Sequence, residues 1–125
     1  MDNIDIYLDG KLLYGNDFDD TQIAEWYADE EEGYANLGAK DAAAYKYAYH
    51  DLNIRHVYRH LHRETFPNVM GFGSAYGDEL QPIISRIGKI TIVDPSDSFI
   101  RETVHGVPAK YVKPSPNGRL PLEDD

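Results

Sequence analysis

The stretch that decides the fold reads Asn68-Val69-Met70-Gly71-Phe72-Gly73-Ser74-Ala75-Tyr76-Gly77-Asp78. Its first five residues form a short apolar run that is typical of a strand, and the small residues after them are typical of a tight turn. Residues 78–87 then have the pattern of a helix, with Pro82 near enough to its start to be tolerated. The order predicted here is strand, glycine-rich loop, helix.

The same alternation continues toward the C-terminus. Residues 89–93 are rich in β-branched side chains and predict a second strand, which ends at Asp94. A short helix is expected over 96–103 and a third strand over 109–112. Strands that alternate with helices are typical of an α/β fold with a doubly wound parallel sheet. We therefore predict that residues 65–125 form a Rossmann-like sheet of three parallel strands.

The first 64 residues lack the alternation of strands and helices predicted for the rest of the chain, and they predict a separate N-terminal cap. Residues 4–14 alternate around Asp9-Gly10, a dipeptide that favours the turn of a β-hairpin. The acids at 17–20 are N-cap candidates for a helix that Gly33 interrupts, and further helices are expected over 40–50 and 51–64. Residues 1–64 should thus form a hairpin followed by a helical cap.

Charge and composition exclude several classes of function. The chain has 125 residues, no cysteine and a net charge of −10. The whole excess of acids falls within residues 1–36, which argues against binding of duplex nucleic acid because phosphates require a basic face. No signal peptide and no apolar run of membrane-spanning length is present, and the lack of cysteine excludes disulfides and thiolate metal sites. We expect a cytoplasmic protein that does not bind membranes.

The glycine-rich loop and the acid after the second strand predict a ligand site. A loop of small residues between a strand and a helix lets a ligand approach the backbone, where helix N–H groups are free. Asp94 follows Gly73 by 21 residues and is expected at the exposed end of its strand. A carboxylate in that place can accept both hydroxyls of a ribose. The two features together predict binding of a cofactor that contains a nucleoside.

At these residues the chain resembles the class I S-adenosylmethionine-dependent methyltransferases, whose first motif reads roughly V-L-D-x-G-x-G-x-G. Val69, Gly73, Gly77 and Leu80 match that motif, Ile92-Val93-Asp94 is similar to the second motif, and residues 118–124 are similar to the stretch after the third strand. The chain departs from the pattern at two positions. Gly71 stands where the family usually has an acid, and Ala75 replaces the middle glycine, which is tolerable if its φ stays negative.

The resemblance implies an enzyme that transfers a methyl group from S-adenosylmethionine to a small molecule or another, unidentified acceptor. It assigns no general base and implies these cofactor-binding residues: Gly71, Phe72, Gly73, Ser74, Ala75, Gly77, Asp94, Pro95 and Ser96. It also implies that residues 65–125 are the first half of the family's domain. Because a sheet that stops after three strands leaves an inner strand uncovered, we expect a downstream segment or self-association to complete it.

Two other functions remain open from the sequence. Asp94 would serve a nicotinamide-binding Rossmann protein equally well, although the glycine spacing misses the tighter dinucleotide fingerprint. The replacement at Gly71 instead favours a non-catalytic binding or scaffold protein.

His56 and His60 lie one helical turn apart but lack the glutamate of a zinc-protease motif, so no metal site is predicted. Tyr14 and Trp26 are candidates for a lid over the site.

Overall fold

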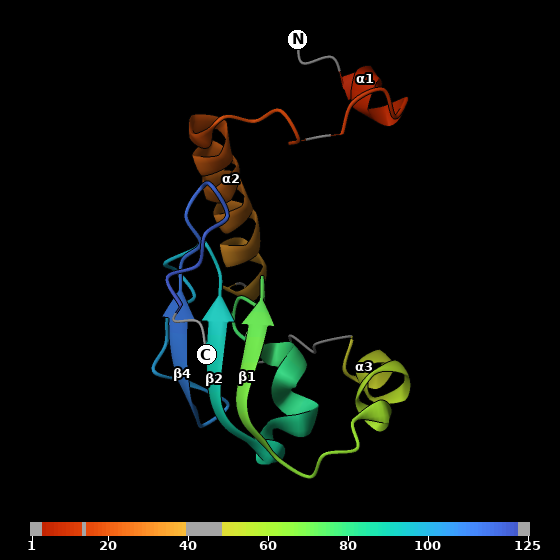
Figure 1. The fold of residues 1–125 in the computed structure, drawn as a ribbon, viewed down its shortest axis with the longest axis vertical. Helices are drawn as coiled ribbons and strands as arrows, with labels where there is room; N and C mark the ends of the chain where they lie inside the picture. The colour runs from red at the N-terminus through yellow and green to blue at the C-terminus, as the bar shows by residue number, and fades with distance from the viewer. Residues whose placement is uncertain (1–3, 14, 40–48, 123–125) are drawn as a thin grey trace.

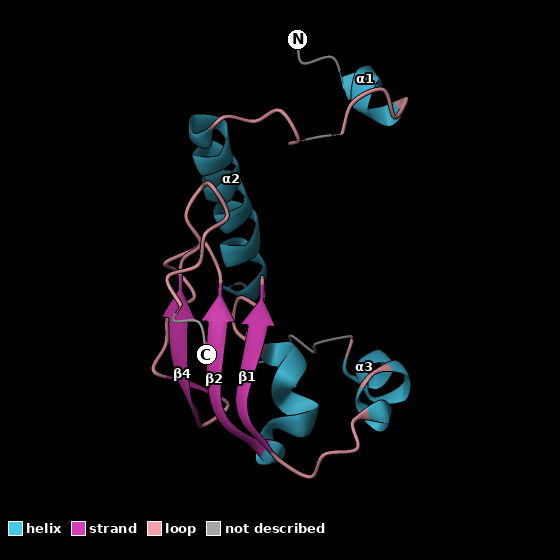
Figure 2. Cartoon of the chain, in the orientation of Figure 1, coloured by secondary structure: helices cyan, strands magenta, loops and turns pink. Residues whose placement is uncertain are grey.

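The computed structural model describes residues 4–13, 15–39 and 49–122 and has an α/β fold. Figure 1 shows its elements in chain order and Figure 2 their type. The elements are α1 (Ile4–Leu8), α2 (Asp20–Ala39), α3 (His50–His56), the 3₁₀ helix η1 (Tyr58–His60), β1 (Phe66–Phe72), the 3₁₀ helix η2 (Asp78–Arg86), β2 (Ile87–Val93), β3 (Thr103–Val104) and β4 (Val107–Val112).

The sheet is mixed and open, with four strands in the order β1-β2-β4-β3. Three strands are parallel, as predicted: β1 pairs with β2, and β2 pairs with β4. The fourth strand, β3, was not predicted and pairs antiparallel with β4. His105 and Gly106 connect these two strands, and both have a positive φ, as two-residue hairpin turns of the primed type require.

One face of the sheet carries the core. Ile90 and Ile92 of β2 are 1% and 0% exposed, and they pack with Leu80 and Ile83 of η2 and with Val104 of β3. Alternate residues of a strand point to the same face, so η2 covers the face on which the two isoleucines lie. Full burial of each such side chain contributes about 1.5–3 kcal/mol, which makes this layer the main source of stability.

On the opposite face β1 is open in the part of the chain that the structure describes, and so is its outer edge, whereas Val93 of β2 and Val112 of β4 are buried. Met70 is 52% exposed and Phe72 is 74% exposed. The only sheet partner of β1 among the described residues is β2. In a parallel ladder alternate residues bond to each neighbour, and Gly73 donates its N–H to Val93 O at 2.8 Å. The backbone groups of the even-numbered residues 68–72 therefore point away from β2.

The prediction of a β-hairpin over residues 4–14 is wrong for the residues that the structure describes there. Residues 4–8 form α1, and Gly10 (φ +68°) ends this helix, with Lys11 N–H donating to Ile6 O at 3.0 Å. A left-handed glycine suits a helix C-terminus as well as a hairpin turn, so Asp9-Gly10 does not distinguish them. Figure 1 shows α1 away from the sheet, beyond α2.

Three helix predictions also change. The beginning of α2 is confirmed by a capping box, in which Gln22 N–H donates to Asp19 Oδ1 at 2.9 Å and Gln22 Oε1 accepts from Asp19 N–H at 3.0 Å. The helix continues through Gly33, so the predicted interruption is wrong. Residues 51–64 are helical only to His60, and residues 96–103 form turns rather than a helix. Of the helix predicted over 40–50, residues 40–48 lie outside the described residues.

The helix predicted over 78–87 is present as η2, but with 3₁₀ geometry. Pro82 lies within it and has no N–H to donate, which removes one α-helical hydrogen bond from the middle of the segment. None of the described helices combines the length and apolar character that a bilayer crossing requires.

The open edge of β1 leads to a prediction about association. Unpaired strand edges without charged residues recruit further strands, and a lysine on the edge prevents this. We expect the chain to associate in a concentration-dependent way and Met70→Lys to shift it to the monomer, as measured by light scattering. Ser85→Lys, on an exposed position of η2, is the control. A parent chain that is monomeric throughout the micromolar range would contradict the prediction.

Candidate functional site

The parallel pairing brings the two predicted loops to one edge of the sheet. The loop of residues 73–77 follows β1, and Asp94-Pro95-Ser96 follows β2. The ladder continues beyond the strands, because Asp94 N–H donates to Val112 O at 3.1 Å. Gly71 and Phe72 close β1 just before the loop, so all nine predicted cofactor-binding residues lie at the carboxyl ends of two adjacent strands. Ligands of open α/β sheets commonly bind at such an edge.

Asp94 joins the two loops directly. Its Oδ2 accepts the N–H of Ala75 and its Oδ1 accepts the N–H of Ser96, both at 3.0 Å. The residue is 7% exposed, so the expectation of an exposed carboxylate is wrong. Buried carboxylates are stabilised by such donors, and two carboxylate oxygens offer about four acceptor positions. Two of these positions are occupied by the protein's own backbone.

The backbone of the loop alternates in handedness. Gly73, Ala75 and Gly77 have φ of +62°, +46° and +72°. The condition under which the sequence allowed alanine here, a negative φ, is therefore not met. A left-handed alanine costs about 1–2 kcal/mol, and two hydrogen bonds offset this: the one to Asp94 and one in which Tyr111 O–H donates to Ala75 O at 3.0 Å. Strained residues held in this way are typical of functional sites.

The lack of an acid at Gly71 has a packing reason. A Cβ at Gly71 would lie 2.8 Å from Ser74 Cβ and 3.0 Å from Ile92 Cδ1. The side chain of Ser74 folds back into the space where the family's acid would begin. The departure at Gly71 and the position of Ser74 are thus one structural feature.

The other two glycines of the loop differ in their surroundings. A Cβ at Gly77 would lie 2.8 Å from Val104 Cγ1, because β3 packs on the loop at this point. A Cβ at Gly73 would meet nothing within 4 Å. Gly77 is therefore required by packing, whereas Gly73 faces open space that a ligand can enter.

Phe99, Arg101 and Tyr111 border the loop, and neither they nor Tyr76 within the loop are among the site residues predicted from the sequence. The rings of Tyr76 and Phe99 meet edge to face at 4.8 Å, and the Arg101 guanidinium lies 4.3 Å from the Tyr76 ring centroid. Burial raises the pKa of Tyr111, so its phenol stays protonated and can donate to Ala75. Phe99, Arg101 and Tyr111 belong to no motif. They reach the site only because residues 99–111 fold beside the loop.

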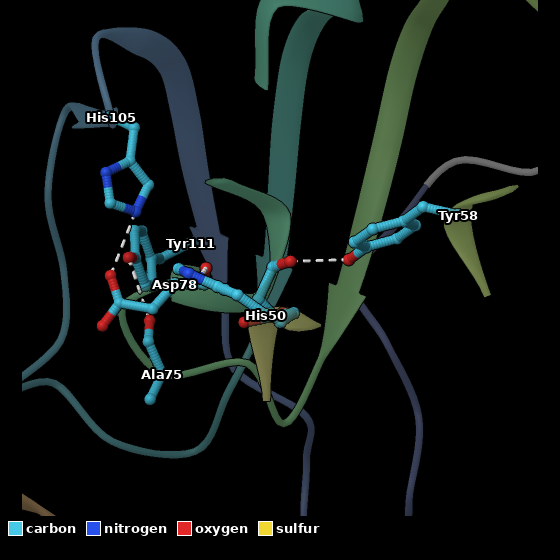
Figure 3. A network of polar contacts seen from close by, with 7 residues as sticks. His50, Tyr58, Ala75, Asp78, His105 and Tyr111 are labelled. Carbon is cyan, nitrogen blue, oxygen red and sulfur yellow. Dashed lines mark hydrogen bonds and ion pairs between the residues drawn. The ribbon is translucent and has the colours of Figure 1, made fainter. Parts of the chain in front are cut away.

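A network of polar contacts holds the beginning of η2 (Figure 3). His105 Nε2 lies 3.0 Å from Asp78 Oδ1, and His50 Nε2 lies 2.7 Å from Asp78 O. Tyr58 O–H donates to Glu79 O at 2.6 Å. The contacts come from α3, η1 and the β3–β4 turn. They therefore connect the N-terminal cap and the β3–β4 hairpin to η2, the segment that follows the loop.

The remaining candidates have separate positions. Trp26 is 42% exposed on α2 and stacks with Tyr27 at 6.0 Å, whereas Tyr14 lies outside the described residues. Glu31 of α2 accepts a hydrogen bond from the Ser98 hydroxyl, which lowers the pKa of Glu31 and links α2 to the segment after β2. Within residues 4–13, 15–39 and 49–122, no group of three or more His, Asp or Glu side chains is placed to hold a metal ion.

Comparisons with known proteins give no relative. No protein-family model, no curated protein and no solved structure matches this chain.

The role of Asp94 in stability is tested by Asp94→Ala. Removal of the carboxylate leaves two buried N–H groups without acceptors, and we expect a loss of at least about 2 kcal/mol in the free energy of unfolding, measured with urea. Asp97→Ala is the control, because Asp97 is exposed and pairs only with exposed Lys113 at 2.6 Å. Equal stability of the two variants would show that Asp94 does not hold the loops together.

Gly73→Ala and Gly77→Ala form a matched pair. Both residues are left-handed, so both variants should lose about 1–2 kcal/mol from backbone strain. Gly77→Ala should lose about 1–3 kcal/mol more, because its new methyl group overlaps Val104. Urea unfolding of both variants measures the difference, and equal losses would show that β3 does not pack on the loop as described.

Proposed function

We propose that the chain binds S-adenosylmethionine at the strand ends and is a methyltransferase for a small molecule or another acceptor that is not yet identified. The observation that carries the proposal is the position of Asp94, whose carboxylate lies between the loop after β1 and the turn after β2. A nucleoside placed there would direct its ribose hydroxyls toward the two remaining acceptor positions of the carboxylate.

The electrostatics of the loop favour a cofactor without phosphates. In dinucleotide-binding folds the loop's N–H groups and the following helix terminus hold a pyrophosphate. Here the N–H of Ala75 already donates to Asp94, and that carboxylate would repel a pyrophosphate. S-adenosylmethionine has a positive sulfonium and no phosphate, so this arrangement supports it over a nicotinamide dinucleotide.

The open space at Gly73 supports the same proposal. Gly73 follows β1 directly, and a ligand can approach its backbone without meeting a side chain. Asp94 would accept the ribose hydroxyls, and Pro95 and Ser96 would border the adenine. The transferred methyl group leaves the sulfur as the acceptor's nucleophile forms its bond to carbon, with S-adenosylhomocysteine as the second product. The protein would contribute mainly positioning and exclusion of water.

One observation favours a second function, a non-catalytic binding or scaffold protein. Each carboxylate oxygen of Asp94 already accepts a backbone N–H without any ligand, so the buried carboxylate has a structural role of its own. The two functions differ in ligand binding: a methyltransferase binds S-adenosylmethionine and S-adenosylhomocysteine, and a scaffold binds neither.

The test is the affinity for S-adenosylhomocysteine, measured by calorimetry, in Gly73→Asn and Gly106→Asn. Asparagine tolerates the left-handed region, and both glycines have positive φ with nothing within 4 Å of an added Cβ. Gly73→Asn should weaken binding by at least about tenfold, because its side chain fills the open space at the loop. Gly106→Asn should bind as the parent does, because residue 106 lies in the β3–β4 turn and is not among the residues proposed to contact the ligand.

Three outcomes are informative. A parent chain whose melting temperature rises with S-adenosylmethionine and S-adenosylhomocysteine, and not with NAD, supports the proposal. A rise with NAD alone favours the nicotinamide-binding alternative. No shift with any of these ligands contradicts cofactor binding and leaves the scaffold as the better function.

A further inference from the structure

Arg101 is held in one place beside the loop. Its guanidinium lies 4.3 Å from the ring centroid of Tyr76, within the range of a cation–π contact. Tyr76 in turn packs edge to face on Phe99, which is 3% exposed. The arginine is therefore an exposed residue whose charged group rests on a ring anchored in the core.

The charge of Arg101 is not neutralised within residues 4–13, 15–39 and 49–122, where no acid or acceptor pairs with it. Other cations of the same region are engaged: Lys113 pairs with Asp97, and Arg86 donates to backbone carbonyls of residues 61–64. A guanidinium has five N–H donors in a planar fork that matches a carboxylate or a phosphate. Within the described residues, the N–H donors of Arg101 have no protein acceptor.

Arg101 lies in the neighbourhood of the proposed ligand. Burial raises the pKa of Tyr111, and the charge of Arg101 partly opposes that rise while Asp94 adds to it. Both charges therefore act on one phenol, which donates to Ala75 O of the loop. Arg101 contacts the ring of Tyr76 and Asp94 accepts the N–H of Ala75, so both charged groups lie against the same loop.

An anionic group beside this loop would need a cation. The N–H groups of Gly73, Ala75 and Gly77 already donate to Val93 O, Asp94 Oδ2 and Ser74 O. The loop itself therefore has few donors left, and the carboxylate of Asp94 disfavours a second negative charge. Only a strong donor such as a guanidinium can offset these two costs.

We propose that Arg101, seated on Tyr76, is the contact for an anionic group, a carboxylate or a phosphate, of the nucleoside ligand that lies along residues 73–77. The inference rests on the proposed function for the place of that ligand. It adds a residue outside the glycine-rich loop and the strand-end acid, and it assigns the charge that this residue selects.

The experiment compares ligands that have an anionic group with related ligands that lack it. S-adenosylhomocysteine and 5′-methylthioadenosine share the adenosine thioether, and only the first has a carboxylate. AMP and adenosine form the corresponding pair for a phosphate. Calorimetry measures all four affinities in the parent chain, in Arg101→Gln and in Arg101→Lys. Arg55→Gln, on an exposed position of α3, is the control.

We expect Arg101→Gln to weaken S-adenosylhomocysteine by about tenfold or more and to leave 5′-methylthioadenosine unchanged. Arg101→Lys should restore part of the loss, because it keeps the charge but not the fork. A selective loss in the AMP pair instead would identify the group as a phosphate. Arg55→Gln should change neither pair.

The results separate this inference from the proposed function. If the parent binds the nucleosides and Arg101→Gln weakens the charged and uncharged members equally, Arg101 only supports Tyr76 and the inference is wrong. Unchanged affinities in Arg101→Gln also overturn it and leave the proposed function intact. A parent that binds none of the four ligands overturns the proposed function and the inference with it.

Discussion

The buried carboxylate of Asp94 is the interaction on which the site depends. It accepts one N–H from the loop after β1 and one from its own turn after β2, so it joins two segments that are 19 residues apart in sequence at their points of contact. The left-handed Ala75 persists because this bond and the one from Tyr111 hold it. Without the carboxylate, the strained loop would lose the contact that offsets its strain.

The sheet provides the frame for this contact, and β1 is the strand that is least covered among the described residues. η2 buries the face of Ile90 and Ile92, whereas Met70 and Phe72 remain exposed on the other face near the outer edge of β1. A face and an edge with apolar residues are typical of surfaces that pair with another segment. The proposed ligand site lies at the ends of the strands, so such pairing would leave it accessible.

Charge is distributed unevenly around the site. The acids of the N-terminal third, which account for the net charge of −10, are concentrated in α2 and before it, and Glu31 links α2 to the segment after β2 through Ser98. Arg101 contributes an unpaired positive charge beside the loop. A ligand at the strand ends therefore meets a buried acid on one side and an exposed guanidinium near it, which favours a molecule with groups of both signs.

Local signals in the sequence determined the three parallel strands, the loop between the first two, the acid at residue 94 and the capping box at Asp19, because each depends on neighbouring residues. The tertiary structure decided the rest. Asp9-Gly10 suits a hairpin and a helix end equally, and the structure shows the helix end, closed by hydrogen bonds such as Lys11 N–H to Ile6 O. The burial of Asp94 and the meeting of Arg101 with Tyr76 depend on segments distant in sequence, whose packing no local pattern encodes.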